Sequence, residues 1–148
     1  MTEASIEPFA KAHLGGLVAL LAAEGWTVYT DDVERTYRAL RAPGVTTLVA
    51  IAGRQVVGAI QVQSDGAIQA HVSMLLIDPE WRGRRLGSRL LRDALDRAGG
   101  LQLDIRTRTE GYYERLGASR SLGFRLTRED LGLRGTRAQY AVDDAGGR

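Results

Sequence analysis

One short stretch decides the fold: Arg82-Gly83-Arg84-Arg85-Leu86-Gly87-Ser88. It follows an apolar run at residues 74–77, which Asp78-Pro79 closes, and it precedes a segment whose apolar residues recur at helical spacing. Those apolar positions are Leu86, Leu90, Leu91, Ala94, Leu95 and Ala98. The stretch therefore predicts a strand, a glycine-containing turn and a helix in succession.

The start of this expected helix has an unusual charge. Backbone N–H groups of a first helical turn lack partners within the helix, and the helix dipole favours a carboxylate there by roughly 0.3–1 kcal/mol. Here the turn carries arginines and no carboxylate. A ligand with several negative charges would remove the conflict, so the turn predicts a phosphate-bearing ligand at a helix N-terminus.

Composition limits the class of protein. The 148 residues, 44% of them hydrophobic, can form one domain with a sizeable core. No apolar stretch approaches the roughly 18 residues that cross a membrane, and the first residues lack a signal-peptide pattern, so we expect a cytoplasmic protein. The absence of cysteine excludes disulfides, thiolate metal ligands and a cysteine nucleophile.

The net charge of +2 hides an uneven distribution. Residues 1–66 carry five basic and seven acidic side chains, whereas residues 67–148 carry fifteen and eleven. Six arginines lie between Arg82 and Arg97, with no aromatic residue among them. A nucleic-acid-binding protein more often has a broad basic face with interleaved aromatics, so we expect no nucleic-acid partner.

The rest of the chain predicts a mixed α/β sheet in a single domain, residues 1–148, with a frayed tail from 143. Asp65-Gly66 predicts a hairpin turn, and the wholly apolar residues 74–77 predict a strand end buried on both faces. We expect helices at 8–23, from Asp31 (as the capping residue) to Pro43-Gly44, at 85–98 and at 110–116, a loop at 24–30, and strands at 46–52, 56–63, 67–77, 101–106, 121–127 and 137–142.

Two pieces of the chain resemble the GNAT superfamily of acyl-CoA-dependent N-acyltransferases. Leu75-Leu-Ile-Asp-Pro-Glu-Trp-Arg-Gly-Arg-Arg-Leu-Gly-Ser-Arg-Leu-Leu91 is similar to its pyrophosphate-binding motif, a strand, an acidic residue and proline, then Gln/Arg-x-x-Gly-x-Gly/Ala. Residues 101–106, followed by Tyr112-Tyr113-Glu-Arg-Leu-Gly117, resemble the next strand and its Tyr-Glu-x-x-Gly-Phe helix end. The resemblance implies a mostly antiparallel sheet, flanked by helices and splayed at the strands that bind the cosubstrate.

The resemblance also implies site residues for acetyl-CoA. The backbone of residues 75–77 would face the acetyl-pantetheine arm, and the turn would hold the pyrophosphate. Tyr113 would protonate the departing thiolate, and Asp104 would reach the acceptor amine through water. The residues expected to bind acetyl-CoA are Leu75, Leu76, Ile77, Arg82, Gly83, Arg84, Arg85, Leu86, Gly87 and Ser88.

Three positions depart from the family pattern. Arg85 stands at the middle glycine of the motif, Thr109 replaces an asparagine that often follows the strand, and Ala118 replaces phenylalanine. The connection from Thr109 to Tyr113 is also about three residues shorter than usual. The Arg85 position is compatible with the motif if its amide still points toward phosphate and its guanidinium lies outside.

The chemistry needs few groups. An alkyl amine has a pKa near 10.4, so a base such as Asp104, with His71 in reserve, must take its proton. A backbone N–H near Leu76 or Ile77 can polarise the thioester oxygen. No metal and no covalent enzyme intermediate is required, and His13 and His71 lie too far apart in sequence to suggest a metal site.

The acceptor is open at this stage: a small amine, an aminoglycoside-like compound, or a protein N-terminus or lysine. His71 and Ser73 share a strand face with Leu75 by simple alternation, and four acids near the first loop (Glu24, Asp31, Asp32 and Glu34) mildly favour a cationic acceptor. The residues expected to contact it are Glu24, Trp26, Tyr29, His71 and Ser73.

Each of these residues also has a purely structural interpretation. Asp104 can be a hydrogen-bonded strand carboxylate, Tyr113 a core aromatic, and Trp26 and Tyr29 helix-packing residues. For the whole protein, the alternative is a non-catalytic CoA-binding sensor or regulatory domain of the same fold. A homodimer is possible, because dimers are common among similar proteins.

Overall fold

The computed structural model describes residues 3–109 and 111–133. Its residues divide into two compact units, Met1–Thr107 and Arg108–Arg148, which are treated separately below. The expected strand at 137–142 and the tail from 143 lie outside the described residues.

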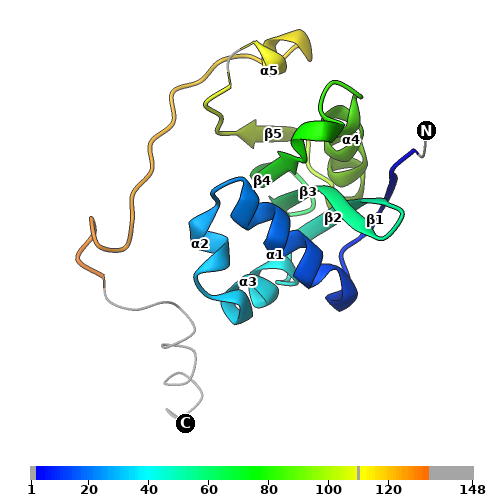
Figure 1. The fold of residues 1–148 in the computed structure, drawn as a ribbon. Coiled ribbons are helices and arrows are strands. Elements are labelled where there is room, and N and C mark those ends of the chain that lie inside the picture. Colours follow the sequence, from blue (N-terminus) through cyan, green and yellow to red (C-terminus); the bar gives the residue numbers. More distant parts are fainter. Residues whose placement is uncertain (1–2, 110, 134–148) are drawn as a thin grey trace. The chain divides into compact units, whose positions relative to one another are not determined.

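A five-stranded sheet forms the centre of the first unit, and its strands follow one another in sequence order (Figure 1). The first three pairings are antiparallel, and only the last, between β4 and β5, is parallel. The strands are β1 (Ser5–Pro8), β2 (Val45–Ala52), β3 (Gln55–Ser64), β4 (Gln69–Ile77) and β5 (Gln102–Ile105). The expected mixed, mostly antiparallel sheet is therefore confirmed.

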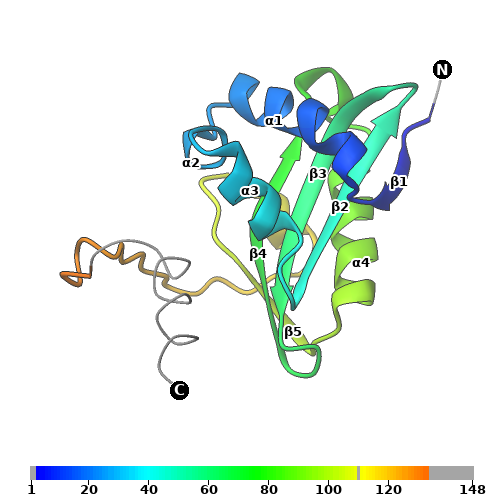
Figure 2. The same ribbon diagram turned by 90° about the horizontal axis from the view of Figure 1, so that it is seen from below.

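Helices cover both faces of this sheet: α1 and α3 pack on one face and α4 on the other (Figure 2). Leu17 and Leu21 of α1 are fully buried against Val49, Ala59 and Met74 of the sheet. The helical elements of this unit are η1 (Lys11–His13), α1 (Leu14–Ala23), α2 (Thr27–Thr30), α3 (Val33–Leu40), η2 (Pro79–Trp81) and α4 (Leu86–Ala98).

The N-terminal third differs from the sequence prediction in three places. The helix expected from residue 8 begins at Leu14, because Ser5–Pro8 pairs with β2 as an additional edge strand. The expected loop at 24–30 contains the short helix α2. Asp32 rather than Asp31 caps α3, since its carboxylate accepts the Arg35 N–H at 2.9 Å.

β4 departs from regular pairing at one position. Gln61 of β3 lies opposite Met74, but the next residue, Val62, lies opposite Val72, so Ser73 is an extra residue on β4. Such a β-bulge shifts the alternation of side chains by one residue. The bulge lies where the pairing of β4 with β5 ends, because that pairing covers only Gln69–Val72 of β4.

The far end of β4 is less buried than the sequence predicts. Met74 and Leu76 are buried, but Leu75 and Ile77 are only half-buried, so the apolar run is not covered on both faces. The physical reason is the missing neighbour: among the described strands, none pairs with this part of β4 on its β5 side. The apolar pattern in the sequence reports hydrophobic side chains, not how many strands flank them.

The second unit contains one short helix, α5 (Tyr112–Arg115), within the expected 110–116. Gly117 follows with a positive φ of 88°, and the Ala118 N–H returns to the Tyr113 carbonyl at 3.1 Å. The strand expected at 121–127 is absent from the described part of this unit: these residues have no strand partner and are exposed. A strand needs a neighbour for its backbone groups, and none of the described residues provides one here.

Candidate functional site

Beyond the bulge, β4 has a free edge, which we define as the side of Ser73–Ile77 that faces away from β3. The Asp78 N–H donates to the Val57 carbonyl of β3 at 2.9 Å, so Ile77 is the residue whose backbone groups point the other way. Arg82 confirms this, because its Nε donates to the Ile77 carbonyl at 3.2 Å. By the same alternation Leu75 also presents its N–H and C=O to the free edge, and Leu76 between them faces β3.

The free edge leads directly into the N-terminus of α4. The connecting turn needs left-handed backbone at two residues, Gly83 with φ 74° and Arg85 with φ 59°. Arg85 is the only non-glycine residue with positive φ in the described chain, and it is the N-cap of α4 without a side-chain capping bond. The first turn of α4 contains no acidic residue, as the sequence predicts, so its N–H groups and dipole are suited to an anion.

Two arginines of the turn have partners within the protein. Nη2 of Arg82 donates to Oε2 of Glu24 at 2.5 Å, across 58 residues of sequence. The guanidinium of Arg84 lies 4.6 Å from the centre of the Trp81 ring, in a cation–π contact. Both guanidinium groups therefore already have partners within the protein.

A group of polar side chains lies on the face of the sheet that α1 and α3 cover, at the paired half of β4 (Gln69–Val72). His71 lies opposite Gln63 of β3 and opposite Asp104 of β5 in register, so the three share this face. The Gln69 amide donates to Oδ2 of Asp104 at 2.7 Å, which fixes this exposed carboxylate. His71 and Asp104, which the sequence predicts as site residues, therefore lie side by side on neighbouring strands.

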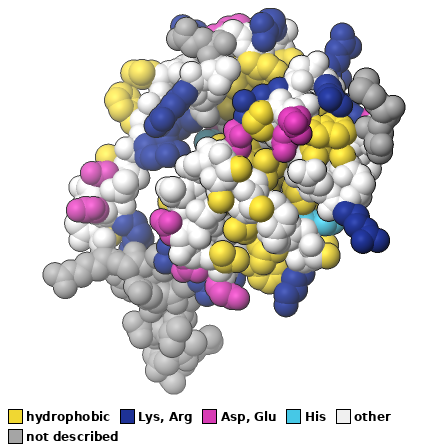
Figure 3. Space-filling view, in the orientation of Figure 1, with side chains coloured by type: hydrophobic (Ala, Val, Ile, Leu, Met, Phe, Trp, Pro, Cys, Tyr) yellow, Lys and Arg dark blue, Asp and Glu magenta, His cyan; other side chains and the backbone are white. Residues whose placement is uncertain are grey.

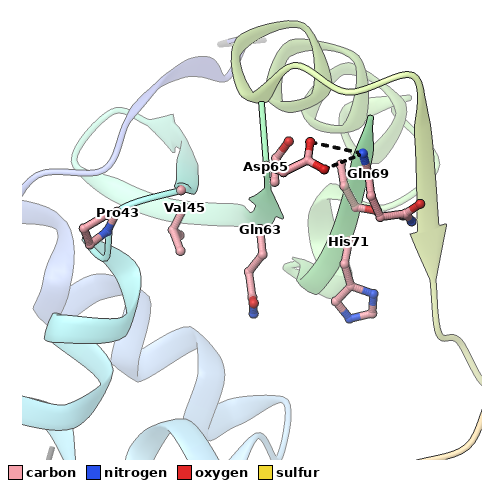
Figure 4. Close-up of a pocket in the computed structure, with 9 residues that line it drawn as sticks. Pro43, Val45, Gln63, Asp65, Gln69 and His71 are labelled. Atoms are coloured by element: carbon pink, nitrogen blue, oxygen red, sulfur yellow. Dashed lines mark hydrogen bonds between the residues drawn. The ribbon is translucent and has the colours of Figure 1, made fainter. Parts of the chain in front are cut away.

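A pocket of about 440 Å³ opens beside this polar group. Its walls come from Pro43–Val45 after α3 and from the β3–β4 hairpin, and the Gln63 and His71 side chains point into it in parallel (Figure 4). Asp65 forms the hairpin turn as predicted. The N–H groups of Ile68, Ala67 and Gln69 hold the pKa of its carboxyl below its ordinary value. The Asp65 carboxylate is thus already engaged by backbone hydrogen bonds within its own turn.

The bulge corrects one prediction about this face. Simple alternation puts His71 and Ser73 on the face of Leu75, but the extra residue moves Leu75 to the opposite face. Met74 instead shares the face of His71, because their partners on β3, Gln61 and Gln63, are two residues apart. Ser73 lies beside Gln63, whose amide donates to the Ser73 hydroxyl at 2.6 Å.

The loop around α2 borders the same face of the sheet. The rings of Trp26 and Tyr29 lie 5.8 Å apart and pack against the core, and the Tyr29 hydroxyl donates to Gln61 Oε1 at 3.4 Å. The four acids near this loop are not equivalent, because Glu24 pairs with Arg82 and Asp32 pairs with Arg35 at 3.2 Å. The charge available to a cationic ligand is therefore smaller than the sequence indicates.

Tyr113 belongs to the second unit, where its ring meets that of Tyr112 edge-on at 4.9 Å. Burial raises the pKa of the Tyr113 phenol above its ordinary value of 10.0, and the neighbouring Tyr112 adds to the shift. The phenol therefore keeps its proton at neutral pH and can donate it.

Sequence reasoning missed three glutamines of the polar face: Gln61, Gln63 and Gln69. A signal was present, because Gln61 and Gln63 are two residues apart and follow the apolar run at residues 56–60. Gln61 is buried and fully engaged, donating to the Ala39 carbonyl at 3.1 Å. Polar residues two positions apart in a strand lie on the same face, so this pattern indicates a group of polar side chains on one face of the sheet.

The visible surface of the first unit carries basic and acidic side chains interspersed with apolar ones (Figure 3). It has no broad basic face in this view. Within residues 3–109 and 111–133, no helix is long and apolar enough to cross a membrane.

Comparison with known proteins gives a consistent result. Residues 17–135 match the family model described as an acetyltransferase (GNAT) domain. A candidate acetyltransferase from Deinococcus radiodurans R1 is 27% identical, with a TM-score of 0.67 over 86% of this chain and 90% of that one. No curated protein sequence matches the chain.

Two further solved structures share the fold at lower identity. A transcriptional regulator from Bacillus halodurans C-125 has a TM-score of 0.71 at 20% identity, covering 84% of this chain and 99% of that one. A ribosomal-protein-alanine N-acetyltransferase from Brucella melitensis biovar Abortus 2308 has a TM-score of 0.67 at 16% identity, covering 85% and 99%. These similarities concern the fold alone.

Proposed function

The chain belongs to the GNAT acetyltransferase domain family, and we propose that it transfers the acetyl group of acetyl-CoA directly to a primary amine. One observation carries this proposal: the free edge of β4 runs into a helix N-terminus that has no acidic residue. An elongated ligand with amides at one end and phosphates at the other fits these two features together.

The donor would be held by backbone groups. The N–H and C=O groups of Leu75 and Ile77 at the free edge suit the amides of a pantetheine arm, and the amides of residues 83–88 suit the pyrophosphate. Gly83 supports this fit, because the space beside its Cα is open. Acetyl-CoA would supply an acetyl group already activated as a thioester. A free-edge N–H would polarise its carbonyl oxygen.

His71 is the best-supported base for the acceptor amine. It points into the pocket, and a neutral imidazole nitrogen can accept a proton from an amine. Asp104 lies beside it but already accepts a hydrogen bond from Gln69, so we assign it the second place. The neutral amine then attacks the thioester carbon, and the sulfur leaves as a thiolate.

Tyr113 is our candidate for the group that protonates the thiolate. Its raised pKa supports this role, because the phenol stays protonated over the working pH range. The α2 loop residues Glu24, Trp26 and Tyr29, together with Ser73, are proposed to border the acceptor. The amine can be a small molecule or a protein amine, and the protein needs no metal for this chemistry.

The proposal is tested by thiol release from acetyl-CoA against a panel of small amines, aminoglycosides and peptides, with products identified by mass spectrometry. We expect release with at least one amine class and a product heavier by one acetyl group. Tight CoA binding without release across the panel would contradict transfer and favour a sensor domain instead.

Replacing His71 with Gln separates the two candidate bases. We expect at least a tenfold lower turnover for His71→Gln, with a rate that recovers as pH rises because the amine then loses its proton unaided. Asp104→Asn serves as the matched comparison, and its loss should be smaller. A larger loss in Asp104→Asn would exchange the two roles.

A further inference from the structure

The guanidinium of Arg82 links Glu24 to the free edge of β4. Its Nη2 pairs with Glu24, the C-terminal capping residue of α1, and its Nε donates to the Ile77 carbonyl at the end of the free edge. The Glu24 side chain is only 20% exposed, whereas that of Arg82 is 56% exposed. The carboxylate is thus the fixed partner and the guanidinium the adjustable one.

The Ile77 carbonyl gives this contact its importance. It is one of the two carbonyls that the alternation of β4 leaves for a ligand at the free edge. In this structure Arg82 already occupies it, at the point where the strand meets the turn. An extended ligand that pairs with Ile77 and places phosphates at α4 would therefore compete with the guanidinium for this carbonyl.

We propose that Glu24 is a positioning residue that controls donor entry by holding Arg82 across the end of the free edge. This rests on the proposed function. Arginine binds phosphate as readily as carboxylate, with the same planar donor pattern, so a bound pyrophosphate offers the guanidinium an equivalent partner. The exchange would open the Ile77 carbonyl and release Glu24.

The Glu24 carboxylate, once released from Arg82, would lie next to the loop that borders the polar face of the sheet. Glu24 begins the loop that carries Trp26 and Tyr29, which border the face with the polar pocket. A free carboxylate there attracts an ammonium group, whereas a paired one does not. The loop would thus become attractive to an amine after the donor has bound.

The test compares Glu24→Gln with Glu80→Gln in calorimetric titrations with CoA. Glu80 lies in η2 beside the same turn, is exposed and has no side-chain partner among the described residues. Its variant therefore removes an equal charge but leaves the Glu24–Arg82 ion pair intact. We expect Glu24→Gln to bind CoA about two- to fivefold more tightly than Glu80→Gln, the range of an exposed ion pair. Arg82→Ala should abolish this difference when combined with each variant.

The outcomes are distinct. Equal affinities in the two variants, or weaker binding in Glu24→Gln, would overturn the inference while leaving the acetyltransferase proposal intact. A wild-type protein that binds no CoA would overturn both. A crystal structure of the CoA complex adds a second readout: the inference requires that Arg82 no longer contacts the Ile77 carbonyl, and retention of that contact would contradict it.

Discussion

The two halves of β4 differ more than their sequence indicates. Gln69–Val72 lies between β3 and β5, whereas Met74–Ile77 pairs with β3 alone. The first half supplies side chains to a polar face, and the second supplies backbone groups to a free edge. One inserted residue, Ser73, marks the boundary between them.

This difference suits the two parts of the strand to the two ligands of the proposed reaction. Before the bulge the polar side chains lie on the α1 face, with His71 among them. After it, the half-buried Leu75 and Ile77 turn to the α4 face, and their backbone groups are left without a strand partner in the described sheet. The proposed acceptor and donor would therefore meet at Ser73 from two directions.

Deleting Ser73 should have the largest effect, because it removes the bulge that separates the two parts of β4. The deletion joins Val72 to Met74, whose side chains already point to opposite faces, so regular pairing with β3 can continue. We expect a folded protein whose CoA affinity falls by about a hundredfold or more, because the free edge loses its shape. Calorimetry and thermal melting measure the two effects. CoA affinity equal to wild type would show that the bulge does not create the site.

Tyr113→Phe separates catalytic turnover from the CoA binding that we assign to the free edge of β4. We expect turnover to fall by about a hundredfold with CoA affinity retained, because only the proton donor is removed. Since burial raises the pKa of Tyr113 above 10.0, the wild-type rate should lose this donor only as pH rises beyond that value. Steady-state kinetics against pH test this. Unchanged turnover would remove Tyr113 from the mechanism.

Gly87→Asp tests the effect of a negative charge at the N-terminus of α4, next to the free edge. A carboxylate in the first turn of α4 suits the helix dipole but repels a diphosphate, so we expect stability to hold while CoA affinity falls at least about tenfold. Titration calorimetry and a melting curve check both parts. Gly87→Ala is the control for the side chain without its charge. Full CoA affinity in the aspartate variant would place the phosphates elsewhere.

Arg85→Gly has the smallest expected effect. Arg85 holds a left-handed backbone with φ 59°, which costs a non-glycine residue roughly 1 kcal/mol, and glycine relieves most of that strain. We expect an increase in unfolding free energy of up to about 1 kcal/mol in urea denaturation. A loss of stability would mean that the Arg85 side chain contributes more than its backbone costs.

The sequence predicts local structure around the motif well, because strand, turn and helix follow each other directly. The expected α4 boundaries hold within one residue, and the absence of acidic residues from its first turn is visible before folding. The glycines of α1 illustrate the limit. They weaken the expected helix, but a Cβ on Gly16 would lie 2.8 Å from Val56, so glycine there permits close packing on β3.

What could not be predicted depends on pairing between distant residues. The bulge at Ser73 exists only relative to β3, and the edge strand β1 exists only because β2 accepts it. The Glu24–Arg82 pair joins residues 58 positions apart, and no local pattern indicates it. Conversely, the strand predicted at 121–127 has no partner among the described residues.

The most direct test of the account follows backbone amide resonances during a CoA titration by NMR. We expect shifts at Leu75, Ile77 and residues 83–88, with little change at Ala70 and Val72, whose strand has neighbours on both sides. Shifts confined to the paired half of β4, or none at saturating CoA, would contradict it.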